Sequence, residues 1–206
     1  MKSLYLAVED ELSEHAGRKI VEYLGGNVVR CFNAGCKSQL QANFQKYRQL
    51  AEREAVLLIV DLDRPSHNMP CASVLINEWS SGRALPSKMF VRIAVREIES
   101  WLIADHEAMK IFIGTGRKFP DEPDKLDDPK RSLLNLLRQK HLRDDVVRLS
   151  KDGNVAQGIA YNNVLGRWVD EYWSPGRAGD KSESLRRAIN KLGQYISDVS
   201  QRKNHL

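Results

Sequence analysis

Acidic side chains follow apolar stretches of the sequence at the point where each stretch ends. Glu9 follows the first stretch, and Asp61 and Asp63 follow the third. Because sites in an open parallel sheet form beyond the carboxyl ends of its strands, we expect these acids to converge if the strands are neighbours. Carboxylates that lie close together repel each other, and a cation such as Mg²⁺, which takes oxygen ligands, removes that repulsion. The pattern therefore predicts a metal site at one edge of a sheet.

The spacing of the aspartates suits a shared ion. Residues two apart in an extended chain point the same way, so Asp61 and Asp63 would reach one ion while Leu62 turns into the core. Acids after a strand also have a simpler explanation, because they favour the first turn of the next helix or a turn. That explanation applies most directly to Glu97 and Glu99, which follow the fourth stretch.

Apolar runs alternate with helical patterns through the first half of the chain. The predicted strands are 4–8, 27–32, 55–60 and 89–95, and the predicted helices are 12–24, 37–54, 71–79 and 97–104. Continuous apolar strands that alternate with helices are typical of a parallel sheet covered on both faces. We expect a single domain over 1–206, with a core at 1–105 and a helical extension at 106–206. In the extension, helices are predicted at 132–141 and 182–200, and loops at 114–130 and 151–158.

Length and composition narrow the class of protein. The chain has 206 residues, 42% of them hydrophobic and 29% charged, which is typical of one α/β domain and excludes fibrous or wholly disordered chains. The longest apolar run has six residues, far short of the ~20 that a membrane-spanning helix needs, and the amino-terminal run is no secretory signal. We expect a cytoplasmic protein whose three cysteines are reduced thiols.

The charge is unevenly distributed. The net charge is +5 overall, but residues 1–63 carry 8 basic and 9 acidic side chains, whereas residues 64–206 carry 24 and 18. An acidic amino-terminal part and a basic remainder suit a metal site beside a site for a polyanion.

Two of these strand ends resemble a known motif. Leu-Ala-Val-Glu at 6–9 and Leu-Ile-Val-Asp-Leu-Asp at 58–63 resemble the TOPRIM (topoisomerase–primase) family, which includes the OLD-type nucleases. The resemblance implies a Rossmann-like α/β domain, with a mostly parallel sheet of about four strands covered by helices and with carboxy-terminal helical additions. The residue after the glutamate is usually glycine in that family and is Asp10 here.

Further segments resemble small bacterial TOPRIM-like proteins that are often linked to phage defence. They are Val-Glu-Asp-Glu-Leu-Ser-Glu at 8–14, Arg-Glu-Ile-Glu-Ser-Trp-Leu-Ile-Ala-Asp at 96–105, Asp-Pro-Lys at 128–130 and Ser-Glu-Ser-Leu-Arg-Arg-Ala-Ile at 182–189. This resemblance makes Glu99 a site residue and adds Asp105 and Lys130 as further candidates.

The resemblance implies phosphodiester chemistry on nucleic acid, performed with Mg²⁺ or Mn²⁺. Asp61, Asp63, Glu9 and Glu99 would be the metal ligands, and Glu9 would also be the general acid or base. Candidates for contacting the nucleic acid are the basic residues Arg64, Arg92, Arg96, Lys130 and Arg131. A companion defence ATPase, or further copies of the chain, are the expected protein partners.

Two other functions fit the same sequence. One is a non-catalytic TOPRIM-fold binding partner in a defence complex, and the other is a phosphatase on a small phosphorylated molecule.

Three smaller features are also open to two interpretations. Residues 114–118 form either a phosphate cradle or an ordinary loop, and Arg92 either pairs with an acid or lies on an edge strand. Four aromatic residues stack on bases or pack in the core: Tyr161, Trp101, Trp168 and Trp173.

Overall fold

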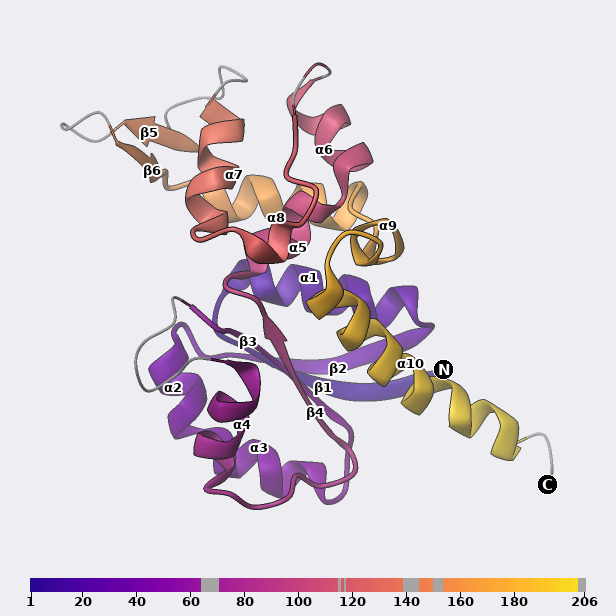
Figure 1. The fold of residues 1–206 in the computed structure, drawn as a ribbon. Coiled ribbons are helices and arrows are strands. Elements are labelled where there is room, and N and C mark those ends of the chain that lie inside the picture. Colours follow the sequence, from indigo (N-terminus) through magenta and orange to yellow (C-terminus); the bar gives the residue numbers. More distant parts are fainter. Residues whose placement is uncertain (64–70, 115, 117, 139–144, 150–153, 204–206) are drawn as a thin grey trace.

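A four-stranded parallel sheet lies at the centre of the computed structural model, which describes residues 1–63, 71–114, 116, 118–138, 145–149 and 154–203. The strands are β1 (Lys2–Val8), β2 (Gly26–Asn33), β3 (Val56–Asp61) and β4 (Met89–Ala94). Their order is β2-β1-β3-β4, and every neighbouring pair is parallel (Figure 1). The predicted α/β class, with four parallel strands, is therefore confirmed.

Both faces of the sheet are covered. In β3, Leu57 and Ile59 face one apolar cluster, whereas Leu58 and Val60 face the other. The first cluster includes side chains of α1 (Glu11–Tyr23) and α10 (Glu183–Lys203). The second includes side chains of α2 (Lys37–Ala42), α3 (Phe44–Ala51) and α4 (Ala72–Ser80), which lie below the sheet in Figure 1. This alternation explains why β3 is apolar from Val56 to Val60.

The junction between β1 and α1 shows how the chain turns at the sheet edge. Asp10 caps α1 by accepting a hydrogen bond from the backbone N–H of Ser13 at 2.8 Å. Its backbone is extended, with φ of −145°, so this position does not need glycine. Gly17 then packs against the sheet, because a Cβ there would lie 2.9 Å from Leu6.

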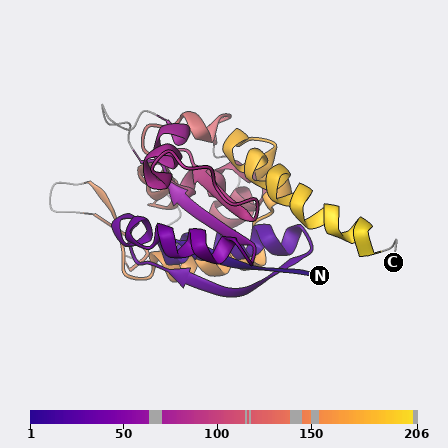
Figure 2. The same ribbon diagram turned by 90° about the horizontal axis from the view of Figure 1, so that it is seen from below.

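The second half of the chain adds helices beyond β4. They are α5 (Ile98–Ala104), α6 (His106–Ile113), the 3₁₀ turn η1 (Pro123–Lys125), α7 (Pro129–Arg138), α8 (Tyr161–Glu171), α9 (Pro175–Gly179) and α10. Two short antiparallel strands, β5 (Val147–Leu149) and β6 (Val155–Gln157), form a hairpin. Most of the extension gathers beyond α1, and α10 runs past β4 along one side of the molecule (Figures 1 and 2). Among the described residues, no helix combines the length and apolar character needed to cross a membrane.

Several predicted elements differ from those observed. The single helix expected over 37–54 is interrupted at Asn43, whose backbone leaves the helical region with ψ of 0°. Part of the loop expected over 151–158 is strand β6, which is too short to show an alternating pattern. Helices α6, α8 and α9 were not predicted, because they pack on other helices, α8 above all on α1, and not on the sheet. All three cysteines are free, as expected.

Candidate active site

Two of the predicted acids meet at the carboxyl edge of the sheet. Strands β1 and β3 are neighbours, so Glu9, which follows β1, lies beside the last residue of β3. The backbone N–H of Asp61 donates to Glu9 Oε1 at 2.8 Å. The structure thus brings together two acids that are 52 positions apart in the sequence.

The Asp61 carboxyl group is the least satisfied of these acids. Its Oδ1 is buried and has no hydrogen-bond partner among the described residues. Burial raises the pKa of Asp61 well above its usual value of 3.8, and repulsion from Glu99, Glu9 and Asp10 raises it further. The negative charge of an ionised carboxylate in this position is not offset by a partner. Such a charge destabilises the folded protein unless a cation binds to it or a proton neutralises it.

Glu9 also binds protons unusually tightly. Burial raises the pKa of Glu9 from 4.5 to about 7, against the opposing effects of the Asp61 N–H and of the Lys37 ammonium. A carboxyl group with a pKa near neutrality is suited to exchanging protons with a substrate at physiological pH.

Glu99 comes from α5 and is almost fully buried, at 3% exposure. Burial raises its pKa from 4.5 to about 7, although Lys130 opposes this effect. The Tyr161 hydroxyl donates to Glu99 Oε1 at 3.1 Å, and Lys130 Nζ lies 3.7 Å from the same oxygen. Glu99 therefore forms an acidic cluster with Glu9 and Asp61, because repulsion from its charge raises the pKa of Asp61.

Asp63 does not follow the extended geometry that its spacing predicts. Its φ is +63°, in the left-handed region, so its side chain does not repeat the direction of Asp61. The carboxylate instead accepts from Lys37 Nζ at 2.6 Å, and the same ammonium donates to the Asp61 carbonyl oxygen at 2.5 Å. Leu62 is buried in the core, as predicted.

These contacts decide how well the acids suit a metal. Across the part of the chain that the structure describes, no three carboxylate, imidazole or thiol groups are arranged so as to hold one ion. The Lys37 ammonium takes one of the expected ligands, the Asp63 carboxylate. The chemistry of the site still fits a hard cation, because the buried Oδ1 of Asp61 has no hydrogen-bond partner among the described residues and carboxylate oxygens are suitable ligands for Mg²⁺.

The basic candidates are placed differently from one another. Lys130 begins α7, where its backbone N–H donates to Glu97 Oε2 at 3.0 Å. Arg96 lies 3.8 Å from Asp127 and lines a cavity of about 360 Å³ together with Asp63 and Glu97. Both residues therefore lie near the acidic edge, whereas Arg64 falls outside the described residues.

Two further arginines form no ion pair with Glu9, Asp61 or Glu99 among the described residues. Arg92 lies on β4, which is an edge strand, as one of the two interpretations of this residue expected. Its Nε is buried and has no hydrogen-bond partner within the part of the chain that the structure describes. Burial lowers the pKa of Arg92. Arg131 Nη2 donates to Asn154 at 3.2 Å.

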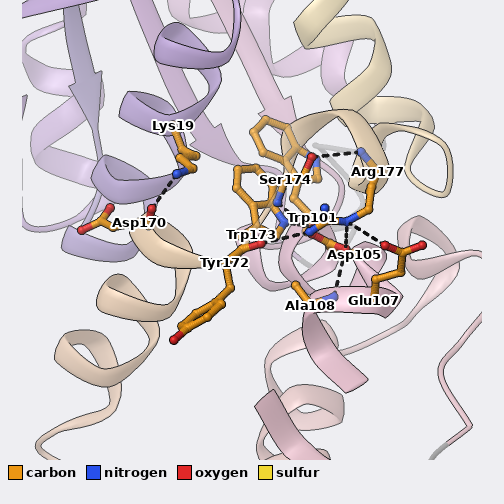
Figure 3. Close-up of polar contacts among 10 residues, drawn as sticks. All are labelled: Lys19, Trp101, Asp105, Glu107, Ala108, Asp170, Tyr172, Trp173, Ser174 and Arg177. Carbon is orange, nitrogen blue, oxygen red and sulfur yellow. Dashed lines mark hydrogen bonds and ion pairs between the residues drawn. The ribbon is translucent and has the colours of Figure 1, made fainter. Parts of the chain in front are cut away.

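Asp105 lies outside the acidic cluster and connects helices of the extension. It is fully buried and caps α6 through the backbone N–H of Ala108 at 3.2 Å. It also accepts from the N–H of Ser174 at 2.7 Å and from two nitrogens of Arg177, both at 2.8 Å (Figure 3). These bonds join α5, α6 and α9, and they account for a buried carboxylate without any ligand.

The four aromatic candidates for base stacking are core residues. Their exposures are between 0 and 3% for Tyr161, Trp101, Trp168 and Trp173. Trp173 Nε1 donates to the carbonyl oxygen of Trp101 at 3.1 Å, so this polar atom is also bonded inside the protein (Figure 3).

The candidate phosphate cradle at 114–118 is only partly described by the structure. Gly114 and Gly116 have positive φ values of 96° and 86°, and Thr115 and Arg117 lie outside the described residues.

Lys37 was not singled out from the sequence, and Tyr161 was considered only for base stacking or core packing. Lys37 lies one residue after Cys36, in a stretch that gave only a helical pattern, and the Tyr161 hydroxyl comes from a helix that was not predicted. Neither residue carries a local signal, because each reaches the site only through the tertiary fold.

Comparison with known proteins gives one distant structural similarity. No family model matches the chain. No curated protein matches it either. Among solved structures, the chain is similar to the C-terminal region of the Burkholderia pseudomallei OLD protein, at 13% identity and a TM-score of 0.43, over 95% of this chain and 98% of that one.

Proposed function

We propose that this protein is a nuclease that hydrolyses phosphodiester bonds with the help of Mg²⁺ or Mn²⁺. The observation that carries the proposal is the buried, unpartnered Oδ1 of Asp61 beside Glu9 at the carboxyl edge of the sheet. A stable fold does not need two such carboxyl groups near each other, and ionising either one costs free energy because of burial and mutual repulsion. Perturbed groups of this kind are characteristic of functional sites.

Each acid has a distinct task in this proposal. Asp61, Asp63, Glu9 and Glu99 are the residues that would hold the cation, which supplies positive charge for a phosphate group when bound. Glu9 has one oxygen fixed by the Asp61 N–H, so its other oxygen is the one to exchange a proton during the reaction. The Tyr161 hydroxyl keeps the Glu99 carboxyl group in place.

Nearby cations would hold the nucleic acid. Lys130 lies 3.7 Å from Glu99, and Arg96 lines the cavity that contains Asp63, so both are within reach of a phosphate at the acidic edge. Arg64, which follows Asp63 directly in the sequence, is proposed for the same task. The resemblance to TOPRIM proteins linked to phage defence extends the proposal to foreign DNA as substrate and to a companion ATPase as partner.

Asp61→Asn tests the proposal. The substitution keeps the shape of the side chain and removes its charge, so we expect at least a 100-fold loss of cation-dependent cleavage of plasmid DNA or a labelled oligonucleotide. Because the change relieves repulsion among buried acids, the variant should melt at or above the temperature of the unchanged protein at pH 8. Loss of activity would then not reflect unfolding.

The matched control is Glu171→Gln, which removes one exposed carboxylate at the end of α8. It should cleave at the rate of the unchanged protein. Cleavage that persists in Asp61→Asn, or that needs no divalent cation, would contradict the proposal. Turnover of a small phosphate ester without cleavage of nucleic acid would favour the phosphatase alternative, and DNA binding without any turnover would favour the non-catalytic one.

A further inference from the structure

A second hollow lies beside the acidic edge, between the outer strand β2 and the helices α2 and α3. It has a volume of about 540 Å³, and the lining residues used below are Arg30, Phe32, Asn33, Gln39, Asn43 and Lys46. We call it the β2 groove. Strand β2 ends the sheet on this side, so no further strand covers the groove.

The β2 groove is positively charged. Arg30 and Lys46 are exposed, and none of the residues that line the groove is acidic. The cavity beside Asp63 is the opposite, since its lining includes Glu97 as well as two further aspartates. The two hollows near the site are therefore suited to ligands of opposite charge.

Both cations of the groove are held in place. The Arg30 guanidinium lies 5.0 Å from the centre of the Phe32 ring, and that ring packs on Tyr47 at 5.7 Å. Lys46 Nζ donates to Asn43 Oδ1 at 2.8 Å. Groups that are already positioned lose less entropy when they bind a ligand.

The groove begins where the acidic site ends. Asn33 pairs with Val8 across the parallel strands, and the N–H of Ala34 donates to the Val8 carbonyl oxygen at 2.9 Å. Glu9 is the next residue after Val8. A chain of phosphates lying in the groove would therefore lead directly to the acidic edge.

We propose that the β2 groove binds the nucleotides of a single nucleic-acid strand next to the bond that is cleaved. The proposal rests on the proposed nuclease function. Arg30 and Lys46 contact phosphates, and the exposed amides of Gln39 and Asn33 bind the Watson–Crick edges of bases, which are accessible only when a strand is unpaired. The volume matches a ligand of a few nucleotides at most.

Fluorescence anisotropy with a labelled eight-nucleotide oligothymidylate tests this proposal. Binding is measured in EDTA, so that no cleavage occurs, at several salt concentrations. The logarithm of the binding constant falls linearly with the logarithm of the salt concentration, and each phosphate contact to a single strand adds about 0.7 to the magnitude of that slope. Arg30→Ala with Lys46→Ala should therefore reduce the slope by about 1.4. It should also weaken binding about 25-fold in ~0.1 M salt.

The control removes the same charge elsewhere. Arg53→Ala with Arg83→Ala changes two exposed arginines that precede the amino ends of β3 and β4, whereas the acidic cluster lies at the carboxyl ends. This pair should leave the slope unchanged. Gln39→Glu is a second variant, because its exposed side chain leaves the fold intact while its charge opposes a phosphate. We expect it to weaken binding at least about fivefold.

The proposal would be overturned if the groove variants and the control variants lost affinity for the oligothymidylate equally. It would also be overturned if a duplex of the same length bound as tightly as the single strand. Failure here is separable from failure of the nuclease function. Asp61→Asn should bind the oligothymidylate normally if the groove is correct, whatever the outcome of the cleavage assay.

Discussion

At the scale of single residues, the acids of the sheet edge are held in three different ways. Glu9 accepts a backbone N–H, Glu99 accepts a tyrosine hydroxyl, and Asp61 has a buried oxygen with no partner. Burial is the main cause of the raised pKa in each case. The cluster therefore binds protons when no cation compensates its charge.

The first prediction concerns the pH dependence of stability. The pKa of Glu99 is 4.5 in an unfolded chain and about 7 in the folded protein, so the folded protein binds protons more tightly. The free energy of unfolding therefore falls as the pH rises from about 4.5 to about 7. For Glu99 the change is ~3 kcal/mol, equivalent to roughly 10 °C in melting temperature.

Thermal melts in EDTA at pH 5 and pH 8 measure this effect. Glu99→Gln should reduce the dependence, because it removes one of the acids whose pKa is raised, whereas Glu171→Gln should preserve it. A melting temperature that rises from pH 5 to pH 8 in the unchanged protein would show that the acids are not buried together.

The sequence identified the acids of the site but not the residues that hold them. Glu9 and Asp61 were predictable because each follows an apolar run, and the ends of neighbouring parallel strands share an edge. Glu99 became a candidate through the family resemblance, because its position after the fourth run also suits an ordinary first helix turn. Lys37 and Tyr161 were not, since nothing in their local sequence indicates what they contact. The left-handed backbone of Asp63 was missed because aspartate, unlike glycine, gives little warning of that conformation.

At the scale of elements, a buried ion pair joins the helices of the extension. Asp105 ends α5, and Arg177 in α9 donates to both of its oxygens (Figure 3). Arg177 is 41% exposed, whereas the Asp105 side chain is at 0%. Removing the arginine would leave a buried negative charge with only backbone N–H groups as partners.

We predict that Arg177→Ala destabilises the protein by about 2 kcal/mol, less than the 3–5 kcal/mol typical of fully buried pairs, because water reaches the arginine. Chemical denaturation measures the change. Arg186→Ala removes an exposed arginine from α10 and should change the stability by less than about 0.5 kcal/mol. Equal effects in the two variants would contradict a structural role for the pair.

The sheet elements were easier to predict than those of the extension. Strand β3 is apolar on both faces and ends at an aspartate, so its type and its end were both evident. Helices α6 and α8 bury their apolar residues against other helices, and β5 and β6 have three residues each. Elements this short depend on tertiary contacts that local sequence patterns do not record.

At the scale of the whole molecule, charge is separated along one edge of the sheet. The acidic cluster follows β1 and β3, and the basic β2 groove lies on the adjacent outer strand. The uneven charge of the sequence predicts a metal site in the acidic part of the chain and a polyanion site in the basic remainder, residues 64–206. The groove that we propose is instead formed within residues 30–50, in the part of the chain whose net charge is −1.

The central claim is that the acidic cluster, with Asp61 and Glu9 as its central pair, binds a divalent cation. Titration of the full chain with Mn²⁺ at pH 8, followed by electron paramagnetic resonance, tests it most directly, with Asp61→Asn and the control Glu171→Gln measured alongside. We predict saturable binding to the unchanged protein and to the control, weakened about 100-fold or more in Asp61→Asn. Absence of saturable binding, or equal binding by Asp61→Asn and the unchanged protein, would contradict the claim.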